Sequence, residues 1–155
     1  MSELPVFELD DLEAAAPFAV ASFDVDDAAR LGTIALEVIR EHGWSLAIDI
    51  VLGETLVFRA MTGETGEGNV RWLAGKAAVA RHYGVPSLLA KRRLEAAGRT
   101  VTDDGLDADS HPAYGGAIPI LVGGDVIGTV TASGEPDVID HAAAAEAVRR
   151  FLATT

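Results

Sequence analysis

The chain has 155 residues, of which 49% are hydrophobic and 23% charged, and its formal net charge at pH 7 is −12. This length and composition predict one globular domain with a substantial core. Because nucleic acids and anionic lipid surfaces are bound through lysine and arginine, the acidic surplus excludes both as expected partners, and no stretch is apolar enough to span a membrane.

Residues 1–21 are expected to form an N-terminal extension, followed by a single domain over 22–155. The first residues are acidic and lack a basic flank followed by an apolar core, so no signal peptide is expected. The chain has no cysteine, which excludes disulfides and thiolate metal sites and agrees with a cytoplasmic location. Residues 8–16 are acidic and rich in alanine, and they predict a short, loosely docked helix that Pro17 ends.

An amphipathic helix is predicted between Asp24 and Gly43. Asp24 is suited to cap its N-terminus, and two further aspartates fall in the first turn, where the helix dipole favours anions. Apolar residues then recur at helical spacing, and Gly43 stands where a C-terminal glycine belongs.

A β-hairpin is predicted over residues 44–61, because SLAIDIVL and LVFRAM both alternate around a GET turn. A two-residue loop would place Asp49 opposite Phe58, whereas a three-residue loop over 53–55 pairs Asp49 with Arg59. We predict the three-residue loop, because it lets opposite charges meet and separates apolar from polar residues by face. The apolar face would then hold Ile48, Ile50, Leu52, Leu56, Phe58 and Ala60.

Two helices, a second hairpin and a last helix follow. Asn69 is expected to cap a helix over Val70–Tyr83, and Pro86 or Ser87 starts another that ends at Ala97. Gly123 and Gly124 are expected to form the turn of the second hairpin. Pro136 and Asp137 open the last helix, whose predicted inner face is Val138, Ala142, Ala145, Val148 and Leu152.

This order of elements predicts an α+β fold. Hairpins imply antiparallel pairing, so we expect an antiparallel sheet of four or five strands built from two hairpins with flanking helices. The first and last long helices are expected to pack together on one face of the sheet.

The sequence lacks the common catalytic and nucleotide-binding motifs. It has no P-loop, no H-E-x-x-H, no G-x-S-x-G and no G-x-G-x-x-G, so no catalytic residue is identified. The acidic run Asp103, Asp104, Asp107 and Asp109 lacks the EF-hand pattern, and we expect it to form turns and helix caps rather than a metal site.

Among the four histidines, His111 has the clearest ligand-binding interpretation, because it lies in a loop beside Tyr114 and a pair of glycines. His42 and His82 fall in the last turns of helices, where they suit the dipole. His141 is expected to pair with Asp137 or Asp140.

Trp72 and Lys76 stand four residues apart on a predicted helix. One interpretation is a cation–π pair between them, and the other is that Lys76 points into a cleft and meets an anionic group. The basic run Lys91–Arg93 is expected to form a solvated helix face or to pair with the acidic surplus.

Several motifs, in order, resemble the haem-degrading-domain family of GlcG/HbpS-like proteins, and in particular its cytoplasmic, uncharacterised branch. They are N-x-x-W-x-x-x-K at Asn69–Lys76, L-x-x-x-G-R-T at Leu94–Thr100, GGAIPI at Gly115–Ile120 and G-x-V-I-G-T-V at Gly124–Val130. The resemblance covers roughly residues 22–152. It implies a profilin-like fold, a compact homo-oligomer assembled from dimers, and haem as the bound or degraded cofactor.

The chain departs from the branch pattern at three positions. Tyr114 stands where a histidine is expected, Gly75 where an arginine is expected, and Ile118 where a phenylalanine is expected. Haem would require an axial ligand from His111, Tyr114, His82 or His141, and a cation such as Lys76 for its propionates. The candidate ligand-binding residues are Asn69, Trp72, Lys76, His111, Tyr114, Gly115 and Gly116, with no resident metal site.

Three functions are therefore considered. The first is an oligomeric haem-binding or haem-degrading protein, and the second is a non-catalytic oligomeric module that holds a small molecule or a partner protein. The third is an enzyme acting on a small carboxylic acid, for which the sequence displays no acid–base pair. We expect the first, in a protein that associates with itself.

Overall fold

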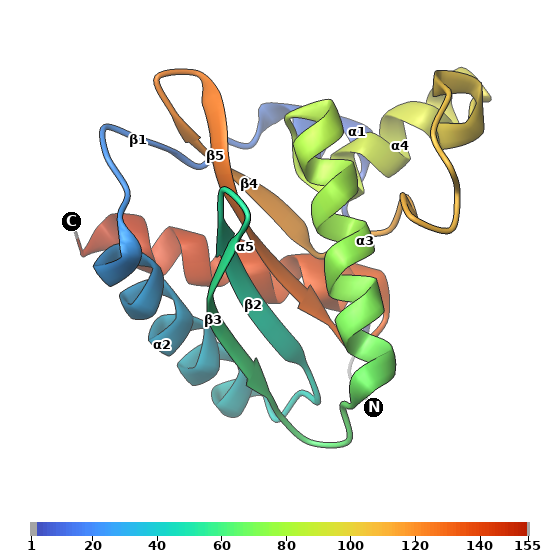
Figure 1. Cartoon of the computed structure of the whole chain (residues 1–155). Coiled ribbons are helices and arrows are strands. Elements are labelled where there is room, and N and C mark those ends of the chain that lie inside the picture. Colours follow the sequence, from blue (N-terminus) through green and yellow to red (C-terminus); the bar gives the residue numbers. More distant parts are fainter. Residues whose placement is uncertain (1–2, 155) are drawn as a thin grey trace.

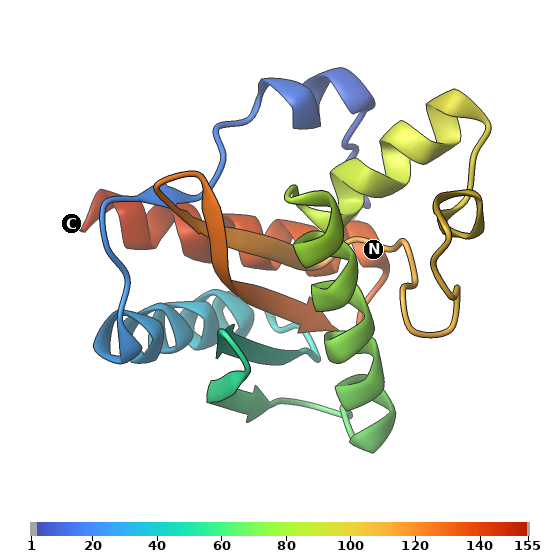
Figure 2. The same cartoon turned by 45° about the horizontal axis from the view of Figure 1, so that its top comes forward.

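The fold is a five-stranded sheet with helices on both faces. A computed structural model describes residues 3–154; in it, α2 and α5 lie side by side on one face and α3 crosses the other (Figure 1). Figure 2 shows α1 and α4 packed together beside the sheet. In chain order the elements are α1 (Leu9–Ala14), β1 (Ala19–Val20), α2 (Val25–His42), β2 (Ala47–Leu52), β3 (Thr55–Met61), α3 (Glu67–Tyr83), α4 (Ser87–Ala97), a 3₁₀ turn (Val101–Asp104), β4 (Ala117–Val122), β5 (Asp125–Ser133) and α5 (Asp137–Ala153).

The α+β class and the placement of the first and last long helices are confirmed, but the sheet is mixed. Its strand order is β1-β4-β5-β2-β3, and β1 pairs with β4 in parallel while the other three pairs are antiparallel. The prediction of a purely antiparallel sheet is therefore wrong at one edge. The cause is Phe18, whose buried ring anchors the chain there and whose carbonyl accepts the N–H of Leu121 at 2.9 Å.

In the first hairpin, the predicted Asp49–Arg59 pair is confirmed and the predicted loop is wrong. The turn has two residues, Gly53 and Glu54, and a β-bulge at Val57 then shifts the register so that Asp49 still faces Arg59. The Arg59 guanidinium donates to the Asp49 carboxylate at 3.0 Å. Because the bulge turns Leu56 away from the predicted apolar face, that side chain is 46% exposed.

The main core lies between the sheet and the α2–α5 layer. It gathers large side chains of β2, β4 and β5 against both helices, and Phe18, Phe23 and Phe151 pack edge to face or tilted at 5.5–5.8 Å. The predicted inner face of α5 is mostly wrong. Of its five residues only Val148 is buried, because the buried stripe runs instead through Asp140, Ala144, Ala147 and Phe151.

The helix ends follow local rules. Asp24 and Asp27 form a reciprocal capping box on α2, and Gly43 adopts the left-handed conformation at its end, as predicted. Helix α3 begins at Glu67, three residues before the predicted start. Asn69 is therefore inside the first turn, where its side-chain oxygen accepts the N–H of Gly66 at 3.0 Å. Within residues 3–154, no helix is both long and apolar enough to cross a membrane.

The second hairpin turns at Gly123 and Gly124, as predicted. Their φ angles are 60° and 84°, which suit the mirror-image turn that two-residue hairpins favour. The hairpin delivers Ser133 at the end of β5, directly before α5, and thereby places the start of α5 next to α3.

Candidate functional site

Two neighbouring cavities are separated by one pair of aromatic side chains. The α4 cavity, about 810 Å³, lies among α3, α4 and the loop before β4. The α5 cavity, about 370 Å³, lies where α3 meets the start of α5. Trp72 and Tyr114 line both, with ring centroids 5.5 Å apart and planes at 82°. Both rings are nearly half exposed, so they are accessible from either side.

Gly75 explains how the loop reaches α3. A Cβ atom at this position would lie 2.6 Å from Cδ of Pro112, so only glycine lets the loop pack this closely on the helix. The arginine that the resemblance leads one to expect here would displace the loop. Gly75 thus places Tyr114 against Trp72.

The α4 cavity carries several charged groups, most of which are already paired. Arg99 pairs with Asp104, whereas Arg71 forms no ion pair with any residue of the described range 3–154. Lys91 donates to Asp137 at 2.9 Å and lies over the Tyr114 ring, 4.7 Å from its centroid. Arg71 lines the same cavity as the two exposed aromatic rings, a combination that suits a planar anion. The Asp109 carboxylate in the same lining also forms no ion pair within residues 3–154.

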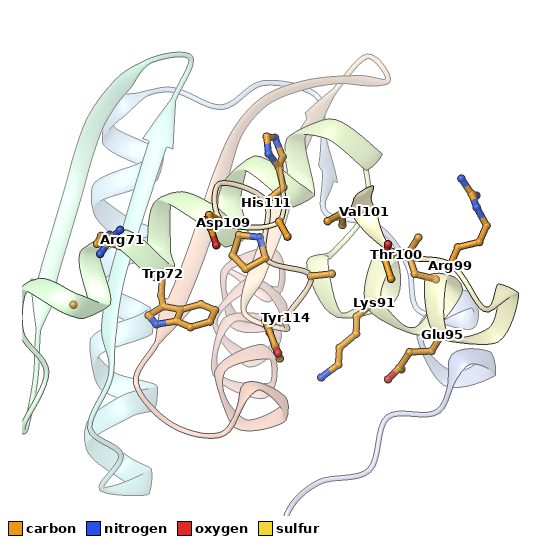
Figure 3. A pocket seen from close by; sticks show the side chains of 15 residues that line it. Arg71, Trp72, Lys91, Glu95, Arg99, Thr100, Val101, Asp109, His111 and Tyr114 are labelled. Carbon is orange, nitrogen blue, oxygen red and sulfur yellow. The ribbon is translucent and has the colours of Figure 1, made fainter. Parts of the chain in front are cut away.

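His111 lines the α4 cavity but turns away from the aromatic pair. Figure 3 shows its ring and that of Tyr114 pointing to opposite sides of the loop. Its Nδ1 shares a hydrogen bond with the Ser110 hydroxyl at 2.9 Å, and its ring lies 6.3 Å from that of His82.

Lys76 is buried at the base of the α5 cavity in an ion pair. Its ammonium donates to Oδ2 of Asp140 at 2.6 Å and to the carbonyl of Ala132 at 3.2 Å. The interpretation as a cation–π pair with Trp72 is therefore wrong, and the anionic group that Lys76 meets belongs to the chain itself. Burial raises the pKa of Asp140 to about 6, and Lys76 opposes that rise.

Asp137 connects the two cavities through its carboxylate, which accepts the Lys91 ammonium and the Gly115 N–H at 3.0 Å. Burial alone would raise the pKa of Asp137, but the Gly115 N–H and Lys91 outweigh it and the pKa is lowered. Gly115 and Gly116 are required by packing. A Cβ on Gly115 would lie 2.7 Å from the Asp137 carbonyl, and one on Gly116, where φ is 138°, would lie 2.3 Å from the Ala132 carbonyl.

The expectation that His141 pairs with an aspartate is wrong. Its ring is buried and packs edge to face on Phe7 at 4.9 Å, and its Nδ1 has no hydrogen-bond partner in the described part of the chain. Burial lowers the pKa of His141 to about 4. His42 stacks on Trp44 at the end of α2, and His82 lies in the last turn of α3, as predicted.

The acidic loop forms turns and caps, as expected. Asp103 accepts the Thr100 N–H at 2.8 Å, and Asp107 accepts the Asp109 N–H at 2.7 Å. The basic run on α4 pairs with acidic residues, since Arg92 contacts Glu95 and Arg93 contacts Glu13.

The predicted ligand-binding residues divide between the cavities. His111 lies only on the α4 cavity, Asn69 and Lys76 only on the α5 cavity, and Trp72 and Tyr114 on both. His111, Tyr114 and Lys76 therefore do not share one cleft. The candidate site residues did not include Ser133, Asp137 and Asp140, which come from the β5–α5 junction. The pairs Ser133-Gly134 and Asp140-His141 belong to the family resemblance, but their residue types did not indicate a cavity.

Comparison with known proteins supplies the family. The model of the "Haem degrading protein HbpS-like" family matches residues 23–149. The chain belongs to this family. A UPF0303 protein of Streptomyces coelicolor is 38% identical over 149 residues, covering 95% of this chain and 93% of that protein.

The fold comparison agrees. The crystal structure of the Ybr137w protein matches with a TM-score of 0.81 at 24% identity, covering 94% of this chain and 88% of that one. The crystal structure of a PduOC–haem complex matches with a TM-score of 0.69 at 18% identity, covering 83% of this chain and 94% of that one. At these identities the likeness establishes the fold alone.

Proposed function

We propose that this protein binds a planar, anionic aromatic molecule of the haem class in the α4 cavity. The observation that carries the proposal is a cavity of about 810 Å³ with the Trp72–Tyr114 pair on its wall and an unpaired arginine in its lining. Ligand cavities in proteins measure about 300–1,000 Å³ and combine apolar walls with a few placed polar groups. The aromatic rings would hold the flat face of the ligand.

The cavity lining also offers side chains that could bind the propionates and the iron of haem. Arg71 has no ion-pair partner among residues 3–154, and its guanidinium can bind a propionate through two parallel hydrogen bonds. Nε2 of His111 has no partner within residues 3–154, but this ring turns to the side of the loop opposite the aromatic pair, so it does not face a haem held by that pair (Figure 3). Tyr114, which lies on the cavity wall, is therefore the candidate axial ligand. Bound haem would supply redox and oxygen chemistry at its iron, while the residues of this chain hold and orient it.

The relatives support haem over other planar anions. The family is described by haem degradation, and a protein of the same fold has been crystallised with haem. Binding is therefore the function that we propose.

Titration with hemin tests the proposal. We expect a saturable shift of the Soret band at one hemin per chain, and a change in band position in Tyr114→Phe, which removes the phenolic oxygen. Arg71→Gln is expected to weaken binding by about tenfold or more, because a hydrogen bond to a charged group is worth about 1.5–3 kcal/mol. Arg40→Gln, on α2 at the opposite face of the sheet, is the matched control.

A flat titration at stoichiometric protein would contradict the proposal. Equal weakening by Arg71→Gln and Arg40→Gln would instead show that hemin binds through general charge rather than in the α4 cavity.

We also infer that the protein associates with itself along β3. This strand forms one edge of the sheet, and its Leu56 and Met61 side chains are 46% and 40% exposed. Such an edge pairs readily with another strand unless it is blocked. Sedimentation is expected to find an oligomer that Leu56→Lys dissociates, and a wild-type monomer would overturn the inference.

A further inference from the structure

We propose a second binding site, in the α5 cavity, for a small uncharged molecule rich in hydroxyl or carbonyl oxygens, such as a polyol or a hydroxy-carbonyl compound. This site is separate from the haem-class site and does not depend on it. The cavity measures about 370 Å³, at the small end of the range for ligand cavities. It therefore suits a molecule much smaller than haem.

The first supporting observation is an unpartnered hydroxyl. Ser133 is only 3% exposed and lines the α5 cavity, yet its Oγ makes no hydrogen bond with any residue in the range 3–154. Ser133 Oγ is not among the fully buried side-chain atoms of that range that lack a partner, so it opens into the cavity, where the oxygen of a small ligand can reach it.

Two further sets of donors face the same cavity. Asn69 uses its amide oxygen on Gly66, which leaves both N–H bonds of its amide nitrogen without a partner among the described residues. The Lys76 ammonium has three N–H donors and, in the part of the chain that the structure describes, only two acceptors, Asp140 and Ala132. Ser133, Asn69 and Lys76 come from β5 and from two turns of α3, so their spare donors surround one space. A ligand here must carry several acceptor oxygens.

The charges around the cavity favour an uncharged ligand. Lys76 pairs with Asp140 and Lys91 pairs with Asp137, so these four charges balance. Glu135 remains. Among residues 3–154 its carboxylate accepts only the Ser45 N–H, and it gives the cavity a surplus negative charge that opposes an anion. A cation would meet the spare N–H donors instead. Hydroxyl groups satisfy both kinds of neighbour, because they accept and donate.

The aromatic pair completes the match. Trp72 and Tyr114 form a wall of the α5 cavity, and their faces can cover the C–H groups of a polyol while its oxygens contact the donors. The site thus combines one apolar wall with a polar base.

Fluorescence of Trp72 provides the test. The chain has two tryptophans, so the Trp44→Phe variant leaves Trp72, between the two cavities, as the single reporter. Dihydroxyacetone and glycerol are the uncharged probes, glycolate is the anionic probe and ethanolamine is the cationic probe. We expect a saturable change with an uncharged probe, at lower concentration than with either charged one.

Two variants locate the binding. Ser133→Ala removes the hydroxyl, and Asn69→Asp removes the spare N–H donors while keeping the oxygen that caps α3. Each substitution is expected to weaken the binding of the uncharged probe by about two- to tenfold, which is the effect of losing one hydrogen bond. Thr129→Val is the matched control, because it removes another buried, unpartnered hydroxyl from the same face of β5 that lines neither cavity.

Three results would overturn the proposal: no saturable change with any uncharged probe, tighter binding of glycolate or ethanolamine, or equal effects of Ser133→Ala and Thr129→Val. Because none of these measurements uses hemin, their failure leaves the haem-class proposal standing, and a flat hemin titration leaves this site standing.

Discussion

The buried His141 should make the fold sensitive to acid in a way that one substitution removes. Its ring packs on Phe7 and burial lowers its pKa to about 4, whereas an unfolded histidine titrates near 6.5. Between about pH 4 and 6.5 the imidazole is therefore protonated in the unfolded state and neutral in the folded state. Stability that is fully present above pH 6.5 is lost as the pH falls toward 4.

The magnitude follows from the two pKa values. A difference of about 2.5 units corresponds to about 3 kcal/mol of unfolding free energy, since one unit is worth about 1.4 kcal/mol. Asp140 works in the opposite direction: its raised pKa means that its ionisation costs stability as the pH rises from about 4 to 6. The two effects partly cancel in the wild type, so a variant is needed to separate them.

The assay is urea unfolding of wild type and His141→Phe at pH 7 and pH 4.5. The phenylalanine keeps the edge contact with Phe7 and does not titrate. We expect the wild type to lose about 2–3 kcal/mol more than the variant between these pH values. Any constant cost of the larger ring cancels in this difference. Parallel losses in the two proteins would refute the reasoning.

Three further predictions concern the packing of the site. Lys76→Met should lower the free energy of unfolding, measured in urea, by about 3–5 kcal/mol, because it leaves the Asp140 carboxylate buried without its partner. The double variant Lys76→Met, Asp140→Leu should recover most of that loss, and a double variant as unstable as Lys76→Met would contradict this account. Gly116→Ala should lower stability by at least about 1–3 kcal/mol, since φ is 138° and the new Cβ would meet the Ala132 carbonyl; an unchanged denaturation midpoint would show that the backbone relaxes. Gly75→Ala should displace the loop at Pro112 and weaken hemin binding while far-ultraviolet circular dichroism stays unchanged; unaltered hemin affinity would separate the loop from the site.

Most helices and both hairpins were predictable because their signals are local. The Asp24–Asp27 capping box and Gly43 bound α2, and Gly123 and Gly124 fix the second turn. β1 carried no such signal, because two residues have no periodicity and their pairing depends on Phe18 reaching a distant pocket. The bulge at Val57 likewise depends on tertiary packing rather than on the turn sequence.

The buried face of α5 and the partner of Lys76 could not be read from the sequence for related reasons. Residues 142–145 are all alanine, so the helix offers little contrast between faces, and Phe151 decides which side turns inward. Asp140 lies 64 residues beyond Lys76, and only the fold brings them together. The contact between Trp72 and Tyr114 could not be predicted either. Both residues were candidates from the sequence, but their contact depends on the close packing of the loop on α3 at Gly75.

The most direct test of the central claim, a haem-class ligand in the α4 cavity, is quenching of Trp72 fluorescence by iron-free protoporphyrin in the Trp44→Phe variant. Because Trp72 lies on the wall of that cavity, we predict saturable quenching at one porphyrin per chain, and weaker porphyrin binding in the Arg71→Gln variant. Emission that stays constant through stoichiometric porphyrin would contradict the claim.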